Sequence, residues 1–257
     1  MSSMRRNVLS SCGALCALLV GTALRAELAD EFVRSFGSLR EMHHENKTGE
    51  VVKLGEFLPN ENLYAVGALA DLAGEITIID GETYLAYPTD RDSVAIVRSK
   101  NADVGATLLV LSEVKSWRGV KSERAVPFEE LDGLIAELVS AVGIPTGIRI
   151  PFLVEGPVEQ LQWHVIDGRR LERGGSSHED HQRAAVRLSV ERAEVRLIGF
   201  YSESDQGVFT HVNSKTHVHC VLEEPQSSGH VDGVVLPAGT TVLFPAQLFQ
   251  TVPKESR

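Results

Sequence analysis

The chain has 257 residues, of which 43% are hydrophobic and 23% are charged. This composition is typical of a globular protein with one large domain or two small ones. The formal net charge of -10 argues against a nucleic-acid partner, because phosphate binding requires a basic surface.

The N-terminus resembles a secretory signal peptide over residues 1–26. Arg5 and Arg6 precede a mostly apolar run, Val8–Leu24, and Ala26 fits a cleavage position. An uncleaved membrane anchor is the alternative, although the run is slightly short and is interrupted by Ser and Gly. We therefore expect a secreted or periplasmic protein that has no membrane contact after cleavage.

Two regions are predicted beyond the signal peptide. Residues 27–145 mix helical and strand patterns and are expected to form an N-terminal α/β domain. Residues 146–257 are expected to form a C-terminal, β-rich, metal-binding domain, because strand patterns dominate there.

The first predicted helix spans Leu28–Glu45, because Phe32 and Phe36 recur at helical spacing. His43 and His44 lie at its end, where positive charge suits the helix dipole. We expect both histidines to be solvated and to bind no metal.

Three strands are predicted within Leu63–Tyr87, with a tight Gly-containing segment after the first and a turn before the third. Asp80-Gly81 lies between two β-rich runs and is a strong signal for a hairpin turn. Glu75 opens the first of these runs in a Gly-rich, apolar setting. A carboxylate in such a place is either paired or functional, and an exposed strand-end glutamate is the alternative.

An amphipathic helix is predicted over Phe128–Val142, and a strand follows at Ile148–Val154. Arg149 stands between two isoleucines at the start of this strand. A buried arginine needs an anionic partner. The partner is either a protein carboxylate or a substrate carboxylate, which the guanidinium fork fits well.

The segment Gly168–Gln182 is polar and rich in Gly and Ser, so it is expected to be a surface loop. His178 and His181 lie within it, but no apolar frame fixes their geometry for metal binding.

Three histidines near the C-terminus form the strongest candidate site. His217 and His219 lie in one apolar run, and His230 follows a turn-like Pro-Gln-Ser-Ser-Gly. In a strand, residues i and i+2 face the same side, and an antiparallel neighbour can bring in the third histidine. Three imidazoles can hold a divalent metal and leave one position open, as a catalytic zinc site requires. Copper, nickel and iron are alternatives to zinc.

Two observations weaken this interpretation. A His-x-His pair alone is more often on the surface or in the core than at a metal. His211 is a competing ligand, six residues before His217, and we place it behind the ligands or on the surface.

Three stretches together match one family in order and spacing. The pattern His217-x-His219-x10-His230, with Gly-Phe-Tyr upstream, resembles the metal site of α-acetolactate decarboxylase. The segment Val66–Tyr84 is similar to that family's Gly-Leu-Gly-Thr…Asp-Gly-Glu signature, and Arg149 resembles its strand arginine. The resemblance covers most of the mature chain.

The resemblance implies an α/β (α+β) fold with two mixed or antiparallel β-sheets and few helices. It places a zinc ion on His217, His219 and His230, on the C-terminal sheet. Glu75 and Arg149 would line the same cavity. Glu75 would act in proton transfer or contact the metal, and Arg149 would bind the carboxylate or the enediolate.

The family's reaction removes CO2 from 2-acetolactate, a small keto acid, and gives acetoin. Zinc chelated by the ketone and hydroxyl oxygens would stabilise the resulting enediolate. The expected partner is thus a small-molecule keto acid, and a homodimer is compatible with the sequence.

Two features depart from the family's pattern. Ala68 stands where the family usually has a threonine, which removes a hydrogen bond to the substrate. The family also uses a glutamate from a C-terminal tail, and this chain stops at Arg257, too early for that spacing. A related 2-hydroxy-3-keto acid as substrate, or weak activity, is the corresponding expectation.

Two alternatives compete with the decarboxylase. A cupin-like β-barrel also uses His-x-His followed by a glutamate, here Glu223, but Thr240 and Thr241 stand where its next histidine is needed. An exported metal- or ligand-binding homologue without decarboxylase activity is the non-enzyme alternative.

Overall fold

The computed structural model describes residues 32–90, 92–145, 147–171 and 178–249. The predicted signal peptide lies outside the described residues. In the described part of the chain, no helix has both the length and the apolar character needed to cross a bilayer.

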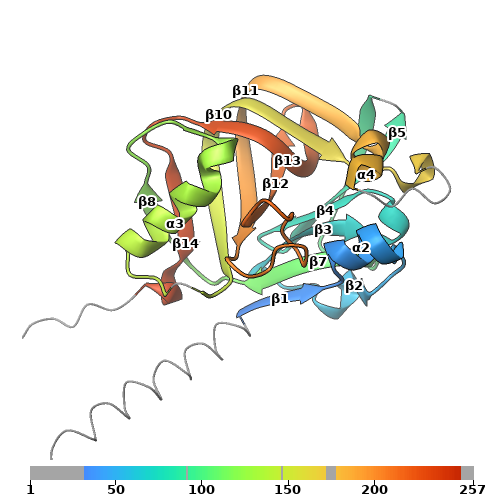
Figure 1. The fold of residues 1–257 in the computed structure, drawn as a ribbon, viewed down its shortest axis with the longest axis horizontal. Helices are drawn as coiled ribbons and strands as arrows, with labels where there is room; N and C mark the ends of the chain where they lie inside the picture. The colour runs from blue at the N-terminus through green and yellow to red at the C-terminus, as the bar shows by residue number, and fades with distance from the viewer. Residues whose placement is uncertain (1–31, 91, 146, 172–177, 250–257) are drawn as a thin grey trace, which may run out of the picture.

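Two seven-stranded sheets form most of the molecule (Figure 1), and every strand pairing in them is antiparallel. The predicted fold of two sheets with few helices is confirmed. The first sheet has the order β1-β7-β3-β4-β5-β6, with β2 also on β7. Its strands are β1 (Val33–Phe36), β2 (Val52–Lys53), β3 (Leu63–Leu69), β4 (Glu75–Ile79), β5 (Glu82–Asp90), β6 (Ser93–Ser99) and β7 (Gly105–Glu113).

The second sheet has the order β8-β14-β10-β11-β12-β13-β9. A further pairing of β10 with β13 closes β10, β11, β12 and β13 into a ring of hydrogen-bonded strands. The strands are β8 (Trp117–Lys121), β9 (Val126–Pro127), β10 (Ile150–Val165), β11 (Val186–Tyr201), β12 (Thr216–Glu223), β13 (Gln226–Leu236) and β14 (Thr241–Pro245).

The α-helices of the described residues lie outside the sheets and are α2 (Leu39–Glu45), α3 (Leu131–Ala141) and α4 (His178–Ala184). The short helices α2 and α4 lie together at one end of the molecule, away from α3 (Figure 1). Single 3-10 turns complete the described elements, at Leu54–Glu56, Ala70–Leu72, Phe128–Glu130, Gly168–Arg170 and Ala246–Leu248.

The helix predicted over Phe128–Val142 is confirmed by α3 and the 3-10 turn before it. The helix predicted over Leu28–Glu45 is wrong for Val33–Phe36, which pairs with β7 as strand β1. Edge pairing in the first sheet overrides the helical spacing, and Gly37, at φ 76°, separates β1 from α2. The predicted loop Gly168–Gln182 is also wrong in part, because α4 begins inside it.

The chain changes sheets between Glu113 and Trp117, whereas the predicted domain boundary falls at 145/146. The two sheets share a core. Val66 and Leu108 of the first sheet pack in one apolar cluster with Phe200 of the second. The division into two domains stays a prediction.

Hairpin turns fix the strand registers that matter for the site. Asp80 and Gly81 both have positive φ, at 53° and 69°, as a two-residue type I′ turn requires, and this confirms the predicted hairpin. Glu224 and Pro225 connect β12 to β13, and the resulting register places His219 opposite His230.

Gly199 on β11 gives a test of this packing. It pairs with Val218, between the two β12 histidines, and a Cβ there would overlap the ring of Phe152. We expect Gly199→Ala to lower the free energy of unfolding by about 1–3 kcal/mol through overpacking, measured by urea denaturation. Gly133→Ala is the control, because a Cβ on this α3 residue meets nothing within 4 Å. It should stabilise the protein by about 0.5–1 kcal/mol. Equal effects of the two changes would contradict this account.

Candidate metal centre

The β12–β13 hairpin brings His217, His219 and His230 together. One ring nitrogen from each histidine lies within 4.8 Å of the other two. His217 and His219 are buried, and His230 is partly buried. All three come from the C-terminal sheet, and their shared orientation follows from the two-residue period of β12 and the hairpin register.

The distances fit a divalent metal ion. His217 Nε2 lies 3.2 Å from His219 Nε2. Two imidazoles on one tetrahedral zinc, each with a bond of about 2.0–2.1 Å, have their nitrogens roughly 3.3 Å apart. The nitrogens of His217 and His219 therefore already have the separation of two zinc ligands, and the nitrogen of His230 lies within 4.8 Å of both.

The protonation state also suits metal binding. Burial lowers the pKa of His217 to about 4, and it lowers the pKa of His219 well below the usual range. Loss of solvent and the neighbouring histidines also lower the pKa of His230. At neutral pH the three rings are uncharged and offer lone pairs, as ligation requires.

A chain of hydroxyl groups orients His219. Its Nδ1 lies 3.0 Å from Thr77 Oγ1, and Ser228 Oγ lies 2.9 Å from Thr77 Oγ1 and 2.8 Å from the Cys220 carbonyl. The carbonyl can only accept, so it takes the single hydroxyl hydrogen of Ser228. Thr77 then donates to Ser228, and His219 Nδ1–H donates to Thr77. This arrangement leaves the Nε2 lone pair of His219 directed at the metal position.

Glu75, at the start of β4, comes from the opposite sheet. Its Oε1 accepts a hydrogen bond from the Ile166 N–H at 3.1 Å, and its Oε2 lies 3.8 Å from His219 Nε2. Burial raises the pKa of Glu75 to about 7, although His164 and the Ile166 N–H oppose the shift. Glu75 is thus a buried carboxyl group that can hold a proton beside the triad.

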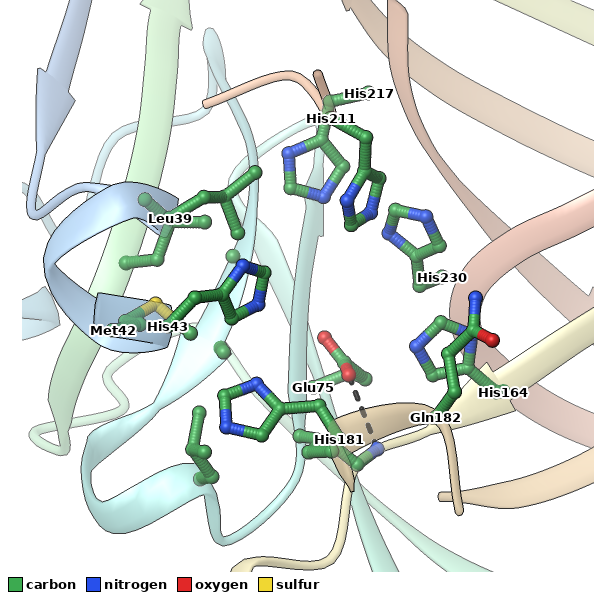
Figure 2. Close-up of a pocket in the computed structure, with 15 residues that line it drawn as sticks. Leu39, Met42, His43, Glu75, His164, His181, Gln182, His211, His217 and His230 are labelled. Carbon is green, nitrogen blue, oxygen red and sulfur yellow. Dashed lines mark hydrogen bonds between the residues drawn. The ribbon is translucent and has the colours of Figure 1, made fainter. Parts of the chain in front are cut away.

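His217, His230 and Glu75 line one cavity, which encloses about 550 Å³ of empty space, part of it open to solvent. Figure 2 shows His43 and His181 on one side, with His164, His217 and His230 on the other and Glu75 between them. Most of the remaining wall is apolar. The apolar and glycine residues are Leu39, Met42, Gly67, Ala68, Leu72, Leu108 and Ile166.

Several histidines lie elsewhere in the structure than the sequence predicts. His43 was expected to be solvated, but it is half-buried and lines the cavity, whereas His44 is exposed as expected. His181 was expected on a surface loop, yet it is buried in α4 and lines the cavity. His211 is expected behind the ligands or on the surface, but it lines the cavity, and its ring packs against His230 with centroids 5.3 Å apart.

His164 was not singled out by sequence reasoning. It lies on β10 opposite His230, with ring centroids 4.8 Å apart. Its Nδ1 is 2.8 Å from Asp232 Oδ1, and Arg187 holds the other oxygen of Asp232. The signal in the sequence was a single histidine. The pairing of β10 with β13, which places His164 opposite His230, cannot be read from the sequence.

Arg149 has a protein carboxylate as partner. Its Nε and Nη2 donate to the two oxygens of Asp205 at 2.8 and 2.7 Å, and its Nη1 donates to the Val33 carbonyl. The guanidinium also lies over the Phe209 ring. Arg149 does not line the cavity, so the structure does not place it beside Glu75 and the triad.

The Arg149–Asp205 pair instead supports one wall of the cavity. The loop after Asp205 accepts hydrogen bonds from the start of α2: Leu39 N–H donates to the Val208 carbonyl and Arg40 N–H to the Gly207 carbonyl. These contacts satisfy donors that a helix start leaves unpaired. Helix α2 in turn carries His43 into the cavity wall.

A family model described as alpha-acetolactate decarboxylase matches residues 45–255. The chain belongs to the alpha-acetolactate decarboxylase family. Family membership and the shared fold indicate an acetolactate decarboxylase-like function with a small-molecule substrate. Ala68 lines the cavity.

Solved structures show the same fold. Alpha-acetolactate decarboxylase from Bacillus subtilis strain 168 has a TM-score of 0.63 and 15% identity, over 83% of this chain and 84% of that chain. A Staphylococcus aureus protein of unknown function, similar to alpha-acetolactate decarboxylase, has a TM-score of 0.63 and 13% identity, over 82% and 84%. No curated protein sequence matches the chain significantly.

Thr77→Val tests the hydroxyl chain, because it removes the acceptor of His219 Nδ1–H while keeping the side-chain shape. We expect the zinc dissociation constant to rise about 10–100-fold, measured by competition with a chromophoric chelator. Thr83→Val is the control: Thr83 is also fully buried in the first sheet, but its hydroxyl has no hydrogen-bond partner among the described residues. Unchanged zinc affinity in Thr77→Val would show that this contact does not orient the ligand.

Proposed function

We propose that the chain binds Zn²⁺ through His217, His219 and His230 and decarboxylates 2-acetolactate, or a closely related 2-hydroxy-3-keto acid, to acetoin and CO2. The observation that carries this proposal is the convergence of one ring nitrogen from each of three histidines beside the buried Glu75 carboxyl group, with His217, His230 and Glu75 lining one cavity. Membership in the decarboxylase family supports the reaction type.

The histidines would hold the metal, and their oriented nitrogens suit this task. When bound, the ion would act as a Lewis acid toward the negative charge that develops on the substrate oxygens. Thr77 fixes the His219 ring for this purpose, so the metal position is defined by contacts from both sheets.

Glu75 is the proposed proton donor. Loss of CO2 leaves an electron pair on the substrate, and the former carboxylate-bearing carbon must then gain a proton. Glu75 Oε1 is held by the Ile166 N–H, while Oε2 lies toward the triad, where it can carry that proton.

The apolar walls would exclude water from the reacting groups. In such a cavity each charge interaction is stronger than in bulk solvent. Ala68 offers space but no hydrogen-bond donor, which supports a related, bulkier hydroxy-keto acid as the alternative substrate. The two hydrogen bonds from the Arg149 guanidinium to the Asp205 carboxylate support a role for Arg149 in holding the cavity wall.

Substitutions at the triad and at Glu75 separate metal binding from turnover. We expect the purified protein to hold about one zinc per chain and to convert racemic acetolactate to acetoin. His217→Ala should abolish both. Glu75→Gln should keep the metal and lower kcat about 10²–10⁴-fold, because it removes the proton that Glu75 holds. Metal analysis and an acetoin assay measure these outcomes.

Zinc binding without acetoin formation in the unmodified protein would contradict the proposed reaction. It would instead support an altered substrate or a homologue that only binds metal.

A further inference from the structure

A groove adjoins the metal-centre cavity on the outer side of α2. It shares Leu39, His43 and His211 with the cavity, so the two spaces meet at α2 and at the loop before β12. The groove encloses about 900 Å³ of empty space, including open solvent. Its other lining residues are Arg40, His44, Gly207, Val212, Asn213 and Ser214.

The ionisable side chains that line this groove are all basic: Arg40, His43, His44 and His211. No carboxylate from the described part of the chain lines it, although the chain as a whole has a formal net charge of -10. Arg40 is exposed and has no carboxylate partner among the residues that the structure describes. A basic groove on an acidic protein concentrates small anions and excludes cations.

The groove is held in shape by backbone contacts. The Arg40 N–H and the Ser38 hydroxyl both donate to the Gly207 carbonyl, at 2.8 and 3.2 Å. Arg40 and His43 are three residues apart on α2, so their side chains lie on the same side of the helix. His43 packs against His181 inside the cavity, with ring centroids 4.8 Å apart.

Among the described residues, no arginine or lysine that could receive an acid group lines the cavity. Arg149, which the sequence predicts in the cavity, instead donates hydrogen bonds from Nε and Nη2 to Asp205. Helix α2 instead carries Arg40, which lines the groove. His43, on the same helix, lines both the groove and the cavity.

We propose that this groove is the entrance for small carboxylates and that Arg40 and His43 bind the acid group of the ligand. The guanidinium supplies a permanent charge, and the imidazole supplies an N–H donor at the junction with the cavity. The proposal rests on the proposed function only for the size and class of ligand.

The test uses two probes and the zinc-loaded full chain. The first probe is 2,3-dihydroxy-2-methylbutanoate, in which the ketone of acetolactate is reduced to an alcohol, so it cannot lose CO2. The second is its methyl ester, which has the same carbon frame without the charge. Calorimetry should show that Arg40→Gln weakens binding of the acid about tenfold and changes binding of the ester less than about twofold. His43→Gln should act in the same direction.

Arg34→Gln is the matched control. Arg34 is also an exposed arginine near α2, but it lies on β1, 3.9 Å from Glu113, and does not line the groove. It should leave both affinities unchanged. Equal weakening of acid and ester in Arg40→Gln, equal effects of the two arginine changes, or no binding of the acid by the unmodified protein would each overturn the proposal. Urea denaturation confirms that each variant is folded.

Acetolactate turnover, measured in parallel, keeps the two proposals separate. Absence of turnover, together with selective loss of acid binding in Arg40→Gln, would support the groove and contradict the decarboxylase. Turnover without that selective loss would do the reverse.

Discussion

The contact between Thr77 on the first sheet and His219 on the second is the constraint on which the site depends. Burying imidazoles at an interface between sheets is unfavourable unless their polar atoms find partners. Thr77, Ser228 and the Cys220 carbonyl supply a complete hydrogen-bond relay for His219. The relay therefore stabilises the packing of the sheets and fixes which ring nitrogen of His219 faces His217. Fold and site are joined at one hydroxyl group.

Much of the fold could be predicted from sequence because the deciding signals are local. Asp80-Gly81 requires positive φ at both residues, and the periodic apolar pattern of α3 needs no distant partner. The strand Val33–Phe36 could not be predicted in the same way. Its apolar spacing also fits a helix, and only its pairing with β7 decides the outcome.

The candidate site divides along the same line. His217 and His219 share a strand, and His230 follows one turn later, so their convergence was visible in the sequence. His43 and His181 come from two helices far apart in the chain, and no periodicity predicts that their rings meet. The partner of Arg149 likewise depended on a loop 56 residues away. Contacts between residues close in the chain can be predicted from the sequence, whereas contacts between distant segments require the tertiary structure.

The β12–β13 hairpin has a consequence for how this family can vary. Side chains alternate between the two faces of a strand, so a one-residue insertion on one arm would turn His230 away from its partners. Adding one residue to each strand beside the Glu224–Pro225 connection lengthens the hairpin without changing the register of the ligands. Natural length changes at this tip should therefore come in even steps, while odd steps should accompany loss of the third histidine.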